Sequence, residues 1–214
     1  MEGRVALVAG STGLIGSQLL ELLLDESRYT RVIALSRKPL SFSHTKLENV
    51  VLEADELKSH NDLKADDVYC CLGTTIRQAK SKEAFRKVDF DYPVGLAALL
   101  KANGANQFLL VSALGSDRSS RIFYNRVKGE VEEAIDKIGF FAYHIFRPSL
   151  LIGPRKDARA GEDAAKIVYK IFGFLIPTKY KGIESIKVAR AMQNVAKINI
   201  PGKFIYESDK LQAF

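Results

Sequence analysis

The sequence RVALVAGSTGLIGSQLL, residues 4–20, is the most informative stretch for the fold. Its first part, Val5 to Ala9, is an apolar run without polar alternation, which is typical of a strand buried on both faces of a parallel sheet. From Ser17 onward, leucines recur at helical spacing, so a helix is expected to follow at once. A glycine-rich turn therefore joins a buried strand to a helix.

The glycines of this turn indicate an anion site. Without side chains they let the backbone turn tightly and approach a pyrophosphate, and the start of the helix supplies N–H groups and partial positive charge. A merely flexible turn is the alternative, but the flanking strand and helix favour dinucleotide binding. The predicted phosphate-binding residues are Gly10, Ser11, Thr12, Gly13, Leu14, Ile15 and Gly16.

Composition bounds the class of protein. The chain has 214 residues, of which 47% are hydrophobic and 27% charged, as in a globular protein, so a single α/β domain over 1–214 is expected. The net charge of +7 would suit anionic small molecules, nucleic acid or acidic membranes. No long basic run or nucleic-acid recognition motif accompanies it, which favours a mildly basic surface or a phosphorylated cofactor over nucleic-acid binding.

Cysteine usage and the start of the chain bear on location. Cys70 and Cys71 are adjacent and are the only cysteines, so they offer no disulfide framework, and a reducing compartment is expected. The first strand follows residues 1–4 directly, and no apolar run approaches the length of a membrane helix. These features predict a cytoplasmic protein without a membrane span.

The end of the second strand, Arg31 to Ser36, predicts which dinucleotide is bound. In dinucleotide folds this strand ends beside the adenine ribose, where a carboxylate accepts from a free 2′-hydroxyl and an arginine pairs with a 2′-phosphate. Here Ser36, Arg37 and Lys38 stand there without a carboxylate. The sequence therefore predicts NADP(H), the alternative being that Arg37 and Lys38 are solvated loop charges.

Strands and helices alternate further along the chain, which predicts one doubly wound parallel sheet. Third, fourth and fifth strands are expected at Val50 to Asp55, Asp67 to Gly73 and Phe108 to Ser112. Asp55 would accept from the adenine amino group or cap a helix. Leu72, Gly73, Thr74 and Thr75 lie at the carboxyl end of the fourth strand, where ligands bind in such sheets. Ser81 should cap a helix that restarts or kinks near Asp91 and Pro93 and ends at Asn103-Gly104.

A serine, a tyrosine and a lysine form a candidate catalytic set. Ser112 ends the fifth strand, and Tyr124 and Lys128 lie four residues apart in a predicted helix, so they share a face. A nearby ammonium favours the phenolate form of a tyrosine, which suits proton transfer, and the Ser112 hydroxyl could hold a substrate oxygen. The alternative is an aromatic packing contact beside a solvated lysine.

These residues, together with the glycine turn, resemble the short-chain dehydrogenase/reductase superfamily in its extended or atypical branch. More narrowly, five segments resemble the TIP30-like NAD(P)-binding oxidoreductases over most of the chain: Cys71 to Thr75, Val88-Asp89, Phe123-Tyr124, Val127 to Glu132 and Phe146 to Pro148.

The resemblance implies roles for particular residues. Tyr124 would be the general acid/base, Lys128 would bind the nicotinamide ribose and tune the tyrosine, and Ser112 would orient the substrate carbonyl. Asp89 stands where extended relatives usually have a Val-Asn pair, so the proton relay of many members is in doubt. After the sixth strand, Tyr143 to Phe146, the residues Arg147, Pro148 and Ser149 would border the nicotinamide, the alternative being an ordinary strand end.

The last third of the chain, about 153–214, is expected to cover the substrate. A helix over Ala164 to Phe174, an apolar stretch to Pro177, a helix over Ile186 to Ile198 and a strand at Lys203 to Tyr206 are predicted there. The apolar stretch would cover the cleft or pack on the core rather than contact a membrane. His44, His60 and His144 share no motif, so no metal is expected.

The leading interpretation is thus an NADPH-dependent oxidoreductase of a small carbonyl substrate. The alternative is a non-catalytic NADPH-binding protein with a regulatory partner, and a second copy of the chain is also left open as a partner.

Overall fold

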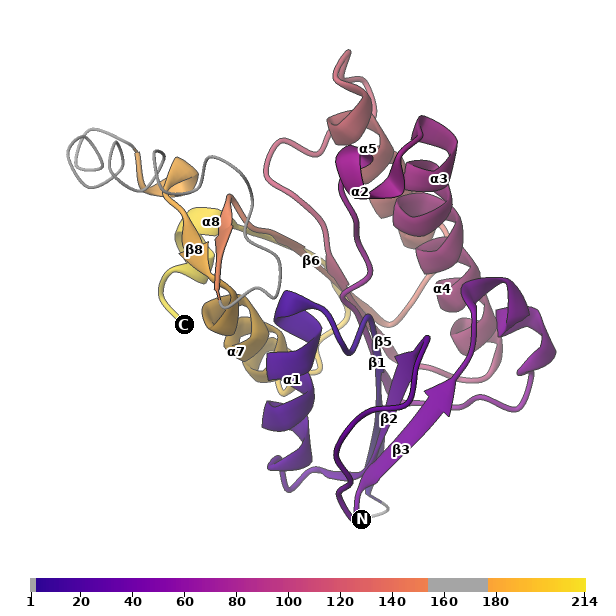
Figure 1. The fold of residues 1–214 in the computed structure, drawn as a ribbon. Helices are drawn as coiled ribbons and strands as arrows, with labels where there is room; N and C mark the ends of the chain where they lie inside the picture. The colour runs from indigo at the N-terminus through magenta and orange to yellow at the C-terminus, as the bar shows by residue number, and fades with distance from the viewer. Residues whose placement is uncertain (1–2, 154–176) are drawn as a thin grey trace.

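Seven parallel strands form the main sheet, in the order β3-β2-β1-β4-β5-β6-β9 (Figure 1). The computed structural model describes residues 3–153 and 177–214. The strands are β1 (Arg4–Ala9), β2 (Tyr29–Ser36), β3 (Leu47–Val51), β4 (Asp67–Cys70), β5 (Gln107–Val111), β6 (Ala142–Arg147) and β9 (Gly202–Glu207). The strand order reverses between β1 and β4, which is the position where doubly wound sheets bind ligands.

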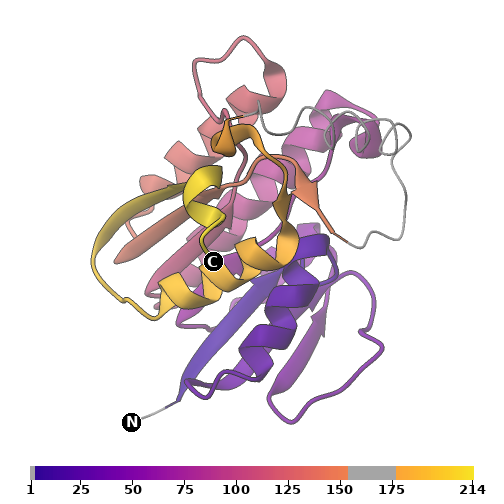
Figure 2. The same ribbon diagram turned by 90° about the vertical axis from the view of Figure 1, so that its left-hand side faces the viewer.

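Helices cover both faces of this sheet. On one face α1 (Leu14–Leu24) and α7 (Ser185–Ala196) lie side by side (Figure 2), and on the other lie α4 (Tyr92–Ala102) and α5 (Phe123–Asp136). Every residue of β4 and β5 is buried, which explains their apolar runs. A fully buried leucine or phenylalanine contributes roughly 1.5–3 kcal/mol relative to an exposed one. The predicted doubly wound α/β fold is confirmed.

Several predicted boundaries were wrong. The fourth strand ends at Cys70 rather than at Gly73. The first helix begins at Leu14 rather than Ser17, with Gly13 as its N-cap. The third strand was expected at Val50 to Asp55, but it ends at Val51, because Val32 to Ser36 of β2 pair with Leu47 to Val51. Asp55 lies instead in a 3-10 helix, η1 (Ala54–Ser59), whose N-cap is Glu53. Propensity alone does not set strand register.

The segment between β4 and β5 contains a change of helix type. Helix α2 (Ile76–Ala79) is followed by α3 (Lys82–Arg86), which Ser81 caps by accepting from the Ala84 amide at 3.0 Å. A π-helical segment, η2 (Lys87–Asp91), then leads into α4. The predicted cap at Ser81 and the stop at Asn103-Gly104 are confirmed, and the predicted irregularity near Asp91 is the π-helical segment.

The last part of the chain adds a second, two-stranded sheet. Strand β7 (Leu151–Ile152) pairs with β8 (Ile183–Glu184), near the short helices η4 (Thr178–Tyr180) and α8 (Ser208–Leu211). Helix α7 and strand β9 confirm two predicted elements, whereas the predicted helix over Ala164 to Phe174 lies outside the described residues. Within the described ranges, no helix is long and apolar enough to cross a membrane.

Candidate functional site

The glycine turn after β1 is closely packed against the loop after β4. Gly10 has φ +77°, and a Cβ there would lie 2.7 Å from the Cys71 carbonyl oxygen. At Gly16, in the first turn of α1, a Cβ would overlap the carbonyl of Gly10. Both positions therefore require glycine. Because α1 begins directly after this turn, its N-terminus lies at the carboxyl end of β1.

The loop after β4 joins this turn to the candidate catalytic helix. The amide of Cys71 donates to Ala9 at 2.9 Å, which fixes the loop beside the end of β1. Two residues later, a Cβ on Gly73 would lie 3.7 Å from Lys128 Nζ. Residues 71–73 thus connect the predicted phosphate-binding turn with Lys128 of α5.

Lys128 forms a buried ion pair. Its Nζ lies 2.7 Å from Asp89 Oδ1, and the two side chains are 5% and 0% exposed. The other carboxylate oxygen of Asp89 accepts from the Thr74 amide at 2.9 Å. Burial by itself lowers the pKa of Lys128, but the Asp89 carboxylate and then Tyr124 raise it, and the net effect is a raised pKa. The lysine is therefore a charged group and not a solvated surface residue.

The surroundings of Tyr124 fit both interpretations of the sequence, a proton-transfer group beside an ammonium and an aromatic packing contact. It lies one turn before Lys128 on α5, close enough for its phenol to interact electrostatically with the ammonium. Its ring also packs against Phe85, with ring centroids 5.5 Å apart. Within residues 3–153 and 177–214, its hydroxyl has no hydrogen-bond partner. The phenol is thus available for a ligand beside a buried cation.

Ser112 is engaged elsewhere. Its buried hydroxyl donates to the carboxylate of Glu132 on α5 and lies 2.9 Å from the Ser116 hydroxyl. Glu132 also accepts from Arg147 Nε at 3.0 Å, and Arg147 reaches Glu207 at 3.2 Å. The side chains of Ser112 and Arg147, both predicted site residues, therefore meet at one buried carboxylate.

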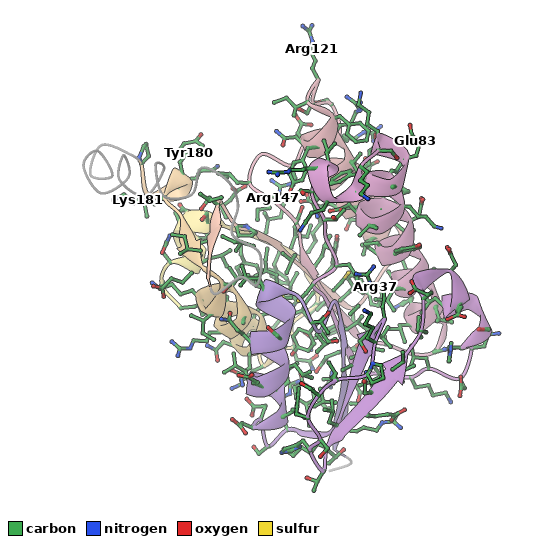
Figure 3. The ribbon with its side chains drawn as sticks, viewed as in Figure 1. Arg37, Glu83, Arg121, Arg147, Tyr180 and Lys181 are labelled. Atoms are coloured by element: carbon green, nitrogen blue, oxygen red, sulfur yellow. The ribbon has the colours of Figure 1, made fainter. Side chains whose placement is uncertain are left out.

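The residues after β6 are held from the C-terminal part of the chain. Pro148 is buried, and its carbonyl accepts from the Leu114 amide at 2.9 Å. The Ser149 hydroxyl donates to the Lys181 carbonyl and accepts from Ser208. Figure 3 shows Tyr180 and Lys181 on one side of the upper end of the molecule and Glu83 and Arg121 on the other.

The residues after β2 are fixed by an asparagine. Asn49 of β3 donates to the Ala34 carbonyl at 3.0 Å and to the Ser36 hydroxyl at 2.8 Å, and it accepts from the Leu40 amide. Ser36 in turn donates to the Lys38 carbonyl. Arg37 is exposed in this loop, and the described residues offer its side chain no partner (Figure 3).

Other predicted contacts have local structural roles. The Ser11 hydroxyl is buried and donates to the Leu35 carbonyl at 2.8 Å. Thr75 caps α2 by accepting from the Gln78 amide. The exposed carboxylate of Asp55 pairs with Lys87 at 2.6 Å.

Sequence reasoning missed three partners at this site: the pairing of Asp89 with Lys128, the role of Glu132, and the role of Asn49. The signal available for the first was an aspartate between the apolar residues Val88 and Phe90 of a predicted helix. Nothing in the sequence distinguishes Glu132 from Glu130 and Glu133, which are half-buried in the structure.

The described residues contain no group of His, Cys, Asp and Glu side chains suited to a metal. His144 is buried, stacks on Phe204 and meets the Tyr206 hydroxyl at 3.2 Å, as expected for a core histidine. Burial raises the pKa of Cys70 to about 12, so this thiol is unreactive near neutral pH.

The doubly wound sheet with its glycine turn defines a dinucleotide-binding class of fold, and comparison with known proteins specifies the family. Residues 6–172 match the NAD dependent epimerase/dehydratase family, and the chain belongs to it. It is 34% identical over 201 residues to the protein HTATIP2 of Rattus norvegicus, covering 91% of this chain and 81% of that protein. The resemblance to TIP30-like proteins is confirmed.

Solved structures support the fold. The enzyme WbmH of Bordetella bronchiseptica, solved in complex with NAD+, is 17% identical, with a TM-score of 0.71 over 96% of this chain and 75% of that one. At this identity the likeness shows the fold alone.

The predicted cytoplasmic location is contradicted. The protein FMP52 of Candida albicans is 32% identical over 157 residues, covering 71% of this chain and 69% of that protein, and its name places it in mitochondria. The FMP52 proteins of Debaryomyces hansenii and Eremothecium gossypii are also named mitochondrial. The prediction was wrong because neither cysteine usage nor the short segment before the first strand identifies a compartment.

Proposed function

We propose that the protein is an NADP(H)-dependent oxidoreductase that reduces the carbonyl group of a small substrate. The observation that carries this proposal is the contact of residues 71–73 with both the glycine turn and Lys128. One dinucleotide lying along this loop would have its pyrophosphate at α1 and its nicotinamide near Tyr124. The family match supports a dinucleotide, and the preference for NADP(H) rests on Arg37 and Lys38.

When bound, the cofactor would supply a hydride to the carbonyl carbon. Tyr124 would give its phenolic proton to the carbonyl oxygen, so that an alcohol forms and the tyrosine is left as phenolate until it is reprotonated. Lys128 would hold the ribose of the nicotinamide and stabilise that phenolate. Both side chains come from one turn of α5, which fixes their relative position.

A role of Ser112 in substrate binding would require a change in its hydrogen bonds. To hold a substrate oxygen, its hydroxyl would have to exchange its bond with Glu132 for one with the substrate. Its contribution is therefore proposed to be smaller than that of Tyr124.

The remaining cofactor contacts are proposed from their position at the carboxyl ends of the strands. Asp55 would accept from the adenine, and the segment after β6 would border the nicotinamide. Residues 153–214 are proposed to contribute to the substrate side. The other predicted contacts are Ser36, Leu72, Gly73, Thr74, Thr75, Arg147, Pro148 and Ser149.

A second candidate is a non-catalytic NADPH-binding protein. The specific observation that favours it is that Lys128 and Ser112 are each already paired with a buried carboxylate. Such pairing reduces the net field on the phenol and the availability of the serine. Under this candidate NADPH would stabilise a surface for a protein partner.

Turnover of Tyr124→Phe decides between the two. A panel of aldehydes and ketones is offered to the native protein with NADPH, and consumption of NADPH is followed. For any substrate that is reduced, Tyr124→Phe should lose about 10²–10⁴-fold in rate while still binding NADPH. Tyr143→Phe is the matched control, because the Tyr143 hydroxyl is buried in β6 without a hydrogen-bond partner in the described part of the chain. Full turnover by Tyr124→Phe would contradict the catalytic proposal, and tight NADPH binding without any turnover would favour the second candidate.

A further inference from the structure

The Asp89 carboxylate links two parts of the candidate site. One oxygen lies 2.7 Å from Lys128 Nζ, and the other accepts from the Thr74 amide at 2.9 Å. Gly73, between this amide and the rest of the loop, is close to both side chains, since a Cβ there would lie 3.5 Å from Asp89 Oδ1. A single buried carboxylate thus bridges α5 and the loop after β4.

The π-helical segment explains how an aspartate reaches this position. Asp89 lies in the middle of η2, which packs against α5, and it is buried, whereas Asp91 in the same segment is exposed. A π-helical turn widens the helix and shifts its side chains, and such turns are frequent at functional sites.

The pair also decides the charge of the lysine. Burial lowers the pKa of Lys128, whereas Asp89, Tyr124 and Cys70 raise it. Asp89 comes from η2, Tyr124 from α5 and Cys70 from β4, and in the described part of the chain these titratable groups act on the ammonium. Asp89 is the strongest of the groups that keep it protonated. Without this carboxylate, a buried ammonium has little to compensate its desolvation.

We propose that Asp89 is a positioning residue of the cofactor site, which holds Lys128 charged and fixed against the loop after β4 so that the ammonium can bind the nicotinamide ribose. This inference rests on the proposed function. The lysine has three N–H donors, and the contact with Asp89 Oδ1 is an ion pair on one side of the ammonium, so donors remain for ribose hydroxyls. Asp89 does not touch the reacting atoms and acts through Lys128.

Asp89→Asn tests the inference through the titration of Lys128. The ε-carbon resonances of labelled lysines are followed by NMR from about pH 7 to about pH 10, and the resonance missing in Lys128→Met identifies Lys128. In the native protein Lys128 should stay charged throughout, and in Asp89→Asn it should lose its proton within this range. Asp91→Asn is the matched control from the same segment, and Asp67→Asn controls for the loss of a buried carboxylate far from the site.

NADPH binding is measured over the same range. In Asp89→Asn the affinity should fall roughly tenfold or more as Lys128 is deprotonated, whereas in the native protein and in Asp91→Asn it should not follow such a titration. Unchanged titration of Lys128 in Asp89→Asn would overturn the inference. An NADPH affinity of Asp89→Asn that does not fall as Lys128 loses its proton would also overturn it.

Two outcomes separate this inference from the proposed function. If Lys128 titrates as expected but neither the native protein nor the variants bind NADPH, the proposed function is contradicted, whereas the ion pair of Asp89 with Lys128 is supported. If Asp89→Asn does not fold, the native protein still decides, because a Lys128 resonance that titrates below the ordinary lysine value would contradict the role given to Asp89.

Discussion

The hydroxyl of Ser112 donates a hydrogen bond to the buried carboxylate of Glu132, which also binds Arg147. Ser112 is 5% exposed and Glu132 is 4% exposed. In this arrangement the serine that ends β5 stabilises the contact between the sheet and α5. A substrate oxygen could accept a hydrogen bond from the Ser112 hydroxyl only by displacing the Glu132 carboxylate.

Replacement of Ser112 by alanine should therefore affect stability more clearly than turnover. A hydrogen bond to a charged group contributes about 1.5–3 kcal/mol, so Ser112→Ala should lower the free energy of unfolding by that order. Urea denaturation measures the stability, and NADPH consumption with a reduced substrate measures turnover. Ser119→Ala, which removes an exposed hydroxyl, is the control. A loss of turnover as large as that of Tyr124→Phe with unchanged stability would assign Ser112 a direct catalytic role.

Replacement of Gly10 by alanine should disrupt the turn. The residue has φ +77°, which costs an alanine about 1–2 kcal/mol, and the added Cβ would press on the Cys71 carbonyl. Gly10→Ala should be destabilised and should bind nucleotide weakly. Gly95→Ala is the matched control, because a Cβ at Gly95 of α4 meets nothing within 4 Å, so this change should stabilise by about 0.5–1 kcal/mol. Thermal unfolding with and without NADPH compares the two variants. Equal unfolding temperatures and equal stabilisation by NADPH in both variants would contradict the role of the glycine turn in folding and nucleotide binding.

Replacement of Arg37 by alanine should discriminate between the two nicotinamide cofactors. If Arg37 pairs with the 2′-phosphate, Arg37→Ala should weaken NADPH binding about tenfold or more and leave NADH binding nearly unchanged. Fluorescence titration measures both dissociation constants. Arg121→Ala removes an exposed arginine at a distant tip of the molecule and controls for net charge (Figure 3). Equal weakening of both cofactors would show that Arg37 does not recognise the 2′-phosphate.

His144 should make stability depend on pH below neutrality. Burial lowers the pKa of His144 to about 4 from 6.5, so the unfolded chain binds a proton at pH 5 that the folded protein does not. The stabilisation is therefore complete above about pH 6.5 and is lost as the pH falls, by on the order of 2 kcal/mol at about pH 5. Urea denaturation at about pH 6.5 and at about pH 5 measures this difference in the free energy of unfolding. The His144→Gln variant should show a smaller difference. His44→Gln, at an exposed histidine, should retain it.

Residues with a local signature could be predicted, whereas those defined by long-range contacts could not. The strand before Gly10 and the cap at Ser81 follow from periodicity and short-range hydrogen bonding, and both are confirmed. The partners of Lys128 and Ser112 depend on how α5 packs against η2 and β5, which no local pattern specifies. The end of β3 was misplaced because register against β2 set it.

Calorimetric titration of the native protein with NADPH and with NADH tests whether the chain has the proposed NADP(H) site. We expect one NADPH to bind per chain, and to bind more tightly than NADH, because the glycine turn would bind both cofactors whereas Arg37 would bind only the 2′-phosphate of NADPH. Absence of binding by either cofactor would contradict the proposed dinucleotide site, and tighter binding of NADH would contradict the assignment to NADP(H).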